Sequence, residues 1–245
     1  MTVHEPNQQG VPGIGENLEQ HFVDITAGCP YGLPEMALYH QALFDSLDDT
    51  TMSVFLANGY RRNGNCMYCM RCPGCRECVP IRLNPETFTP NRNQRRVWKK
   101  NRDVSVGVAA LTMSDENLDL LDRFLRARFP DCKSTAESYY SGFFITSITR
   151  CFEIRFRLDD KLLGVAVVDG SDQWLNAVYF YFDPDQARRS PGILNILHLI
   201  DFCRRNRIRP LYLGYWIESL NSMQYKSAFR PHEILVDDCW QQVDR

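Results

Sequence analysis

Five cysteines recur at every third position between residues 66 and 78, in the segment CMYCMRCPGCRECVP. Two intervening residues let a chain turn back and point both thiolates at one ion or cluster. Pro73 and Gly74 favour a loop over a helix here, and Cys29, in the segment GCPYGLP, is a further ligand candidate from a distant loop. Five thiolates exceed the four positions of a tetrahedral site, so they cannot all bind one zinc ion. The spacing also approaches that of a ferredoxin-type run, so zinc and an iron-sulfur cluster are both chemically reasonable, and a metal-free redox or surface loop is the alternative.

A strongly basic segment, NRNQRRVWKKNR, follows the cysteines at residues 91–102. Residues 61–102 carry eleven Lys and Arg against only Glu77 and Glu86, although the whole chain has a formal net charge of −2. Such a local excess of positive charge indicates a surface that binds phosphates. Trp98 could stack on a base there. A solvated helix face with Trp98 packed inward is the alternative.

The composition is otherwise typical of a globular protein. With 245 residues, of which 44% are hydrophobic, the chain can form one large domain or two small ones. The polar N-terminal segment lacks the apolar run of a signal peptide, and no stretch of about 18 apolar residues could span a membrane, so we expect a cytoplasmic protein. In a reducing compartment, ten cysteines are thiols or metal ligands rather than a disulfide framework.

From about residue 104 the pattern alternates between strands and helices. The chain therefore divides into a Cys-rich part with the basic segment, residues 1–103, and a sheet domain, residues 104–245. We expect strands in VSVGVAAL, CFEIRFRL, KLLGVAVVD, QWLNAVYFYF and LYLGYWI, the second and third of them paired as a hairpin. We expect helices after Ser114, around ESYYSGFF, from Pro191 with Ser190 as its cap, and in NSMQYKSAF. This order indicates an α/β or α+β fold.

The junction DPDQARRSPG lies between a predicted strand and the helix predicted from Pro191. The first N–H groups of a helix have no partner within it, so this junction could bind a phosphate through those donors and the helix dipole. An ordinary capped helix behind an exposed loop is the alternative.

Several segments taken together resemble one known family. They are ANGYRRNGN, Tyr68, CPGCRECVPIRL, NRNQRR and LYLGYWIESLNSMQYKSAFRPHEIL. In this combination the chain resembles the bacterial N-end rule aminoacyl-tRNA–protein transferases over nearly its whole length. It looks closest to the aspartate/glutamate leucyltransferases, which are relatives of the eukaryotic arginyltransferases.

The resemblance implies a GNAT-like acyltransferase domain with a smaller Cys-rich N-terminal domain. It implies transfer of an amino acid, preferably leucine and alternatively arginine, from aminoacyl-tRNA to the free α-amine of proteins or peptides that begin with Asp or Glu, which marks them for degradation. No cofactor is implied for the chemistry. The family's cysteine positions correspond to the candidate ligands of a structural or regulatory zinc ion or iron-sulfur cluster, Cys29, Cys72, Cys75 and Cys78. This chain has Cys69 and Met70 where relatives have Lys or Arg and then Pro, and Cys66 is additional, so Cys66 and Cys69 are competing ligands.

The implied reaction is the aminolysis of an activated ester, which chiefly requires that two substrates be aligned. Such alignment alone can supply an effective molarity of about 10⁵ M or more. Guanidinium groups offer the bidentate geometry that an acidic first residue accepts. The candidate substrate-binding residues are Arg61, Arg62, Tyr68 and Arg82. The candidates for holding the aminoacyl-adenosine end and polarising the ester are Tyr215, Tyr225 and Lys226; packing for the tyrosines and solvent for the lysine are the alternatives. The candidate tRNA-binding residues are Arg92, Arg95, Arg96, Lys99, Lys100 and Arg188.

Two other classes of function remain open. One is a non-catalytic, metal-stapled nucleic-acid-binding protein, and the other is a coenzyme A-dependent acetyltransferase, although RRSPG matches a pyrophosphate loop only loosely. The sequence leaves open the donated amino acid, the metal, the catalytic base and the oligomeric state.

Overall fold

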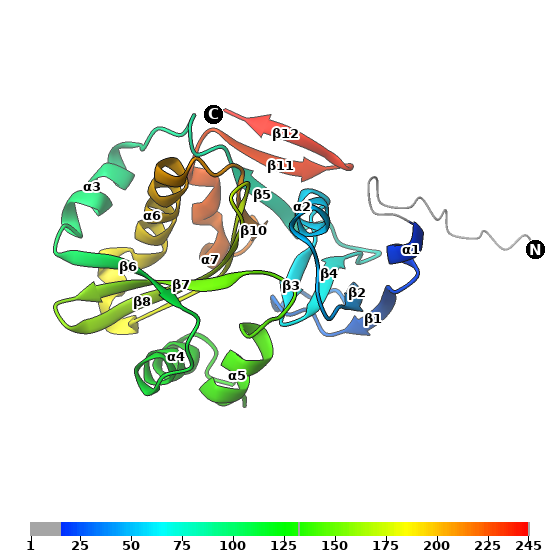
Figure 1. The fold of residues 1–245 in the computed structure, drawn as a ribbon, viewed down its shortest axis with the longest axis horizontal. Coiled ribbons are helices and arrows are strands. Elements are labelled where there is room, and N and C mark those ends of the chain that lie inside the picture. Colours follow the sequence, from blue (N-terminus) through cyan, green and yellow to red (C-terminus); the bar gives the residue numbers. More distant parts are fainter. Residues whose placement is uncertain (1–15, 132, 245) are drawn as a thin grey trace, which may run out of the picture.

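The computed structural model describes residues 16–131 and 133–244, whose strands form two sheets (Figure 1). The smaller sheet has four antiparallel strands in the order β1-β2-β4-β3. They are β1 (Val23–Ala27), β2 (Ala37–Leu43), β3 (Arg61–Asn63) and β4 (Cys66–Met70). The short helix α1 (Glu16–Glu19) precedes this sheet, and α2 (Asp49–Ala57) connects β2 to β3.

Helix α2 covers one face of the small sheet. The Asp48 carboxylate caps it by accepting from the Thr51 backbone N–H at 2.7 Å, which satisfies a donor that the first turn leaves unpaired. Its buried side chains Met52, Phe55 and Leu56 join a cluster that includes residues of β2, β4 and the preceding loop. One face of the small sheet is therefore part of the core.

The larger sheet has eight strands in the order β12-β11-β5-β10-β9-β8-β7-β6. They are β5 (Val79–Leu83), β6 (Val104–Ala110), β7 (Cys151–Leu158), β8 (Lys161–Gly170), β9 (Leu175–Phe182), β10 (Leu211–Trp216), β11 (His232–Val236) and β12 (Cys239–Val243). Neighbouring strands are antiparallel except β9 and β10, which are parallel. The 3₁₀ helix η1 (Pro184–Arg189) and helix α6 (Pro191–Asn206) connect these two, as a parallel pair requires.

Helices cover both faces of the large sheet (Figure 1). Successive side chains of β8 alternate between two cores, as the pleat of a strand dictates: Leu163 packs toward α6 and Leu162 toward α4 (Asp115–Arg128). Helix α3 (Arg92–Lys100) packs beside α6, and α5 (Ala136–Phe143) packs beside α4. None of the helices in the described part of the chain is both long and apolar enough to cross a membrane.

The predicted mixed α/β fold is confirmed, and the expected strands and the β7–β8 hairpin are present. Ser114 caps α4 as expected, by accepting from the Asn117 backbone N–H at 3.3 Å. Ser190 is the N-cap residue of α6 and Pro191 is its first residue, as expected. Ser190 takes a left-handed conformation, with φ at 57°, and its side chain makes no capping hydrogen bond to α6; its carbonyl instead accepts from the N–H of Leu194 at 3.1 Å.

Residues 79–100 bear on the proposed division of the chain at residue 103. Strand β5 pairs with β10 and β11 inside the large sheet, and α3 packs against α6. The large sheet therefore takes a strand from the Cys-rich part of the sequence, while the division itself stays a prediction. The last predicted helical segment consists of two short elements, α7 (Asn221–Gln224) and the 3₁₀ helix η2 (Tyr225–Ala228).

Candidate active site

Strands β9 and β10 separate soon after they meet. Their parallel pairing is limited to Leu211 with Leu175 and Tyr212 with Asn176. Beyond this point the facing backbone groups must find other partners, because a buried carbonyl left without a donor is costly. Two basic side chains supply them: Arg61 Nη2 donates to the Ala177 carbonyl at 2.8 Å, and Lys226 Nζ donates to the Tyr215 carbonyl at 2.6 Å. We call the region around Arg61, Ala177, Tyr215 and Lys226 the splay site.

Arg61 reaches the splay site from β3 of the small sheet. Arg61 is only 8% exposed, and its Nη1 donates to Asn176 Oδ1 at 2.7 Å. Gly214, at φ 82°, lies so close that a Cβ there would be 2.8 Å from Arg61 Nη2, so the guanidinium requires glycine at this position. Among the described residues no carboxylate forms an ion pair with Arg61. A buried cation held only by neutral oxygens is well placed to accept an anion.

Three phenols lie within the electrostatic reach of Arg61. Burial raises the pKa of Tyr68 to about 12, and burial also holds the pKa values of Tyr31 and Tyr215 well above their usual range, while Arg61 partly opposes each shift. All three hydroxyls are therefore neutral hydrogen-bond donors near pH 7. Tyr215 uses its hydroxyl to donate to the Gly59 carbonyl at 3.3 Å.

Lys226 is the second cation of the splay site. Burial, and after it the positive charge of Arg61, lower the pKa of Lys226 to about 7. A large fraction of Lys226 is consequently a neutral amine near pH 7, able to accept a proton. The neighbouring Tyr225 lies elsewhere: its ring packs on the first turn of α6, where a Cβ on Gly192 would be 3.3 Å from the Tyr225 hydroxyl oxygen.

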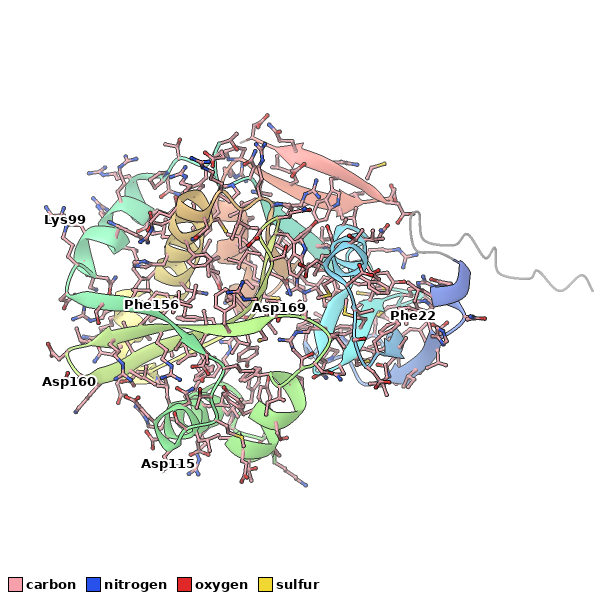
Figure 2. The ribbon with its side chains drawn as sticks, in the orientation of Figure 1. Phe22, Lys99, Asp115, Phe156, Asp160 and Asp169 are labelled. Carbon is pink, nitrogen blue, oxygen red and sulfur yellow. The ribbon has the colours of Figure 1, made fainter. Side chains whose placement is uncertain are left out.

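The other two candidate guanidinium groups already hold carboxylates. Arg62 forms a fully buried pair with Asp169, at 2.8 Å from Nε and 2.6 Å from Nη2. Asp169 lies near the middle of the molecule, where the small sheet meets the large one (Figure 2). Arg82 pairs with Glu233 at 2.8 and 3.2 Å, and its guanidinium stacks 4.1 Å above the Trp240 ring. The geometry therefore favours Arg61 among the three for an incoming acidic group.

Four cysteines gather beside the splay site. Burial raises the pKa of Cys78 to about 12, and the nearby thiols of Cys72, Cys29 and Cys75 raise it as well. We call these four the thiol cluster. Its donor chemistry suits zinc or an iron-sulfur cluster. Across residues 16–131 and 133–244, however, no three His, Cys, Asp or Glu side chains are placed to hold a metal ion.

The competing cysteines belong to a strand. Cys66 and Cys69 lie in β4, where they pair with Leu43 and His40 of β2. Successive strand residues alternate in direction, so Cys66 shares the face of Tyr68 and Cys69 points to the opposite face. Burial raises the pKa of Cys69 to about 11. The ligand set therefore stays a prediction.

The basic segment forms an exposed helix. Asn91 and Gln94 build a capping box at the start of α3, and Gln94 and Val97 are its buried residues. Lys100 Nζ donates to the Arg188 carbonyl of η1 at 2.7 Å, which joins the two basic elements into one surface. The exposed cations of this basic surface are Arg92, Arg95, Arg96, Lys99, Lys100 and Arg188. Trp98 is half-exposed and stacks on His198, with the ring centroids 4.4 Å apart.

Sequence reasoning named Arg61, Tyr68, Tyr215 and Lys226, which the fold brings together, and missed three residues that complete the site. Tyr31 is distant in sequence from the others, although it lies in the GCPYGLP segment that drew attention for Cys29. Asn176 and Gly214 carry no sequence signal of their own, because each matters only through its contact with Arg61.

Two segments of the chain, which together carry these residues, match one known family. Residues 27–96 match the family described as arginine-tRNA-protein transferase, N terminus, and residues 116–236 match its C terminus. An aspartate/glutamate leucyltransferase of Hahella chejuensis is 38% identical over 184 residues, which are 74% of this chain and 79% of the relative. The chain belongs to this family of transferases. An aspartate/glutamate leucyltransferase of Saccharophagus degradans is 34% identical over 201 residues, or 80% of this chain and 84% of that one.

Membership of the leucyltransferase family confirms the predicted family and the prediction of a transferase enzyme. The two matched regions divide the splay site between them, since Arg61 and Tyr68 lie in the first and Tyr215 and Lys226 in the second. Among solved structures, a tandem GNAT protein of the clavulanic acid pathway aligns with 78% of this chain and 59% of its own, at a TM-score of 0.39 and 12% identity. That likeness is too distant to inform the substrate.

Proposed function

We propose that this leucyltransferase-family protein moves leucine from charged tRNA to the α-amine of polypeptides that begin with Asp or Glu, and thereby marks them for degradation. The observation that supports this most directly is Arg61, a buried guanidinium without a carboxylate partner in the described structure, next to the low-pKa Lys226. Charged tRNA is a cytoplasmic substrate, so the proposal places the reaction in the cytoplasm.

Arg61 is the proposed anchor for the acidic side chain of the acceptor. A guanidinium has five N–H donors, and the Asn176 and Ala177 oxygens accept from only two of them. An incoming carboxylate would neutralise the buried charge and gain charge-assisted hydrogen bonds, each about twice as strong as a neutral one. An acceptor with a neutral first residue would leave the cation unpaired, which disfavours its binding.

Lys226 is the proposed proton acceptor. An α-ammonium has a pKa of about 7.7–8.0, so water removes its first proton readily near neutral pH. As the amine nitrogen bonds to the ester carbon, neutral Lys226 takes the second proton, and it returns that proton to the ribose oxygen as the carbon–oxygen bond breaks. The neutral phenols of Tyr31 and Tyr68 can donate to the negative oxygen that forms on the ester carbon.

The basic surface of α3 and η1 is the proposed contact for the tRNA phosphates. It adjoins α6, whose first turn holds the Tyr225 ring. A tRNA bound along this surface would bring its charged end over α6 toward the splay site. The acceptor polypeptide beyond its first residue must then extend away from the splay site in another direction.

The test is a transfer assay with purified protein. Leucyl-tRNA, arginyl-tRNA and one other charged tRNA are each offered to peptides that begin with Asp, Glu, Lys or Ala, and the products are weighed by mass spectrometry. We expect a gain of one leucine residue on the Asp and Glu peptides only. Modification of none of the acidic peptides by any charged tRNA would refute the proposal, and transfer of arginine alone would change the donor.

A further inference from the structure

The small sheet has one face that no helix of the described structure covers. Cross-strand partners share a face, and this one runs through the pairs that begin at Arg61 and Tyr68. We call it the open face, and its residues are Val23, Ile25, Ala27, Ala37, Tyr39, Gln41, Leu43, Arg61, Asn63, Cys66, Tyr68 and Met70. Ala37 and Arg61 are buried on it, so the face is exposed toward its far corner at Val23, Ile25 and Leu43. The opposite face carries Ala42 and Met67, which are buried against α2.

Part of the open face is both apolar and exposed. Leu43 is 78% exposed, Val23 56% and Ile25 44%. Single exposed apolar residues are normal on protein surfaces, whereas several on one strand face are a mark of a binding surface. The rings of Tyr39 and Tyr68 have centroids 5.8 Å apart, so Tyr39 connects this apolar part to Tyr68 at the splay site.

The open face leads directly away from Arg61. One row of cross-strand partners runs from Arg61 to Tyr68, then to Gln41, and ends at Val23. Neighbouring strands are about 4.8 Å apart, so Val23 lies about 14 Å from Arg61 across the sheet. An extended peptide advances about 3.4 Å per residue, so this row matches about four residues of chain.

We propose that the open face binds the acceptor polypeptide from its second to about its fifth residue and selects apolar side chains there. This inference rests on the proposed function, because it takes the first residue of the acceptor to sit at Arg61. Val23, Ile25 and Leu43 would then contact the downstream side chains.

The charge distribution favours the acceptor polypeptide over tRNA as the occupant. Apart from Arg61 the open face bears no Lys or Arg, so nothing on it would neutralise phosphates. The basic surface lies at the other end of the molecule: in Figure 2 the labelled Lys99 of α3 and Phe22, which precedes β1, are on opposite sides. The two substrates would thus approach the splay site from opposite directions.

The first arm of the test varies the acceptor. Peptides of equal length that begin with Asp carry either apolar residues or Gly and Ser at positions two to five, and a two-residue acceptor beginning with Asp serves as the reference. We expect kcat/KM for the apolar peptide to exceed that for the Gly/Ser peptide by about tenfold, a partial share of what burying one or two apolar side chains contributes. Equal values for the two long peptides would overturn the inference.

The second arm varies the protein. The triple variant Val23→Thr, Ile25→Thr and Leu43→Thr keeps strand-compatible side chains but removes apolar area. It should lose the preference between the long peptides while its turnover of the two-residue acceptor is unchanged. Val108→Thr, at a 60% exposed position on the edge strand β6, is the matched control and should keep the preference.

Other outcomes separate the competing explanations. A triple variant that retains the full preference would overturn the inference. So would a wild-type dimer that the triple variant turns into monomers in sedimentation experiments, because the open face would then be an interface between copies. Failure of every acidic acceptor, long and short, with every charged tRNA would instead refute the proposed function itself.

Discussion

Arg61 and Arg62 are consecutive in the chain, yet strand β3 sends their side chains to opposite faces of the small sheet. Arg62 meets Asp169 and becomes part of the structure, whereas Arg61 meets only neutral oxygens and stays available to an anion. The doublet in the sequence predicts that guanidinium groups are present. It cannot predict which one is paired, because that depends on a partner 107 residues away.

Replacing Arg61 with Gln removes the charge and leaves a side chain that can still reach a carbonyl. We expect kcat/KM for an Asp peptide to fall by about 10- to 100-fold, the equivalent of one charge-assisted hydrogen bond of about 1.5–3 kcal/mol. Transfer kinetics with Asp and Ala peptides measure the change. Arg123→Gln, at an exposed pair on α4, is the control and should leave both rates unchanged. An Arg61→Gln protein that keeps its discrimination between Asp and Ala would contradict the assignment.

The lowered pKa of Lys226 predicts that the transfer rate depends on pH. This pKa is lowered to about 7, so protonation below pH 7 should remove the proton acceptor, and the rate should rise with pH in a first step at about pH 7. The acceptor amine adds a second step near pH 8. In the Lys226→Met variant the step near pH 7 should disappear while the step near pH 8 remains. A profile of unchanged shape in that variant would show that another group takes the proton.

At the scale of elements, periodicity and capping residues predicted the strands and helices from residue 104 onward. Ser114 before an acidic first turn is a local signal, and it was sufficient to place the start of α4. The pairing of β5 with β10 was not predictable in this way, because strands so distant in sequence meet through the whole topology. The splay site was not predictable from the sequence for the same reason, because it exists only where β9 and β10 stop pairing after two residue pairs.

The basic surface predicts a strong salt dependence of tRNA binding. Arg95 and Lys99 are exposed on α3, and each neutralised phosphate changes the slope of log affinity against log salt by about 0.7–0.9. The double variant Arg95→Ala and Lys99→Ala should therefore flatten the slope by about 1.5. Filter binding or fluorescence anisotropy over a salt series measures it, with Arg126→Ala on α4 as the control. An unchanged slope would show that α3 is merely a solvated helix.

At the scale of the whole molecule, the Arg62–Asp169 pair joins the small sheet to the large one at the place where the site forms. Breaking a fully buried pair leaves an uncompensated charge, so Asp169→Asn should lower the free energy of unfolding by about 3 kcal/mol or more. Glu116→Gln, which breaks a partly exposed pair with Arg157, should cost under about 1 kcal/mol. Urea titrations of both variants test the difference, and equal losses would mean that the buried pair contributes no more than an exposed one.

The thiol cluster brings together cysteines of two loops, residues 28–36 and 71–78, and we predict that a metal ion or cluster bound there would hold these loops together. A closed site of four thiolates contributes directly to folding, so loading Cys29, Cys72, Cys75 and Cys78 with zinc or an iron-sulfur cluster should protect residues 16–78 from hydrogen exchange more than residues 104–244. Elemental analysis and absorption spectra of anaerobically purified protein distinguish the two metals.

Single replacements then identify the ligands. Cys72 belongs to the thiol cluster, and its sulfur accepts from the Leu38 backbone N–H at 3.4 Å, whereas Cys66 is held in β4 opposite Leu43. Cys72→Ser should therefore release the metal and Cys66→Ser should retain it. Full reactivity of all four thiol-cluster residues toward an alkylating reagent in metal-replete native protein would rule the site out. Loss of metal in Cys66→Ser with retention in Cys72→Ser would move the site to the strand cysteines.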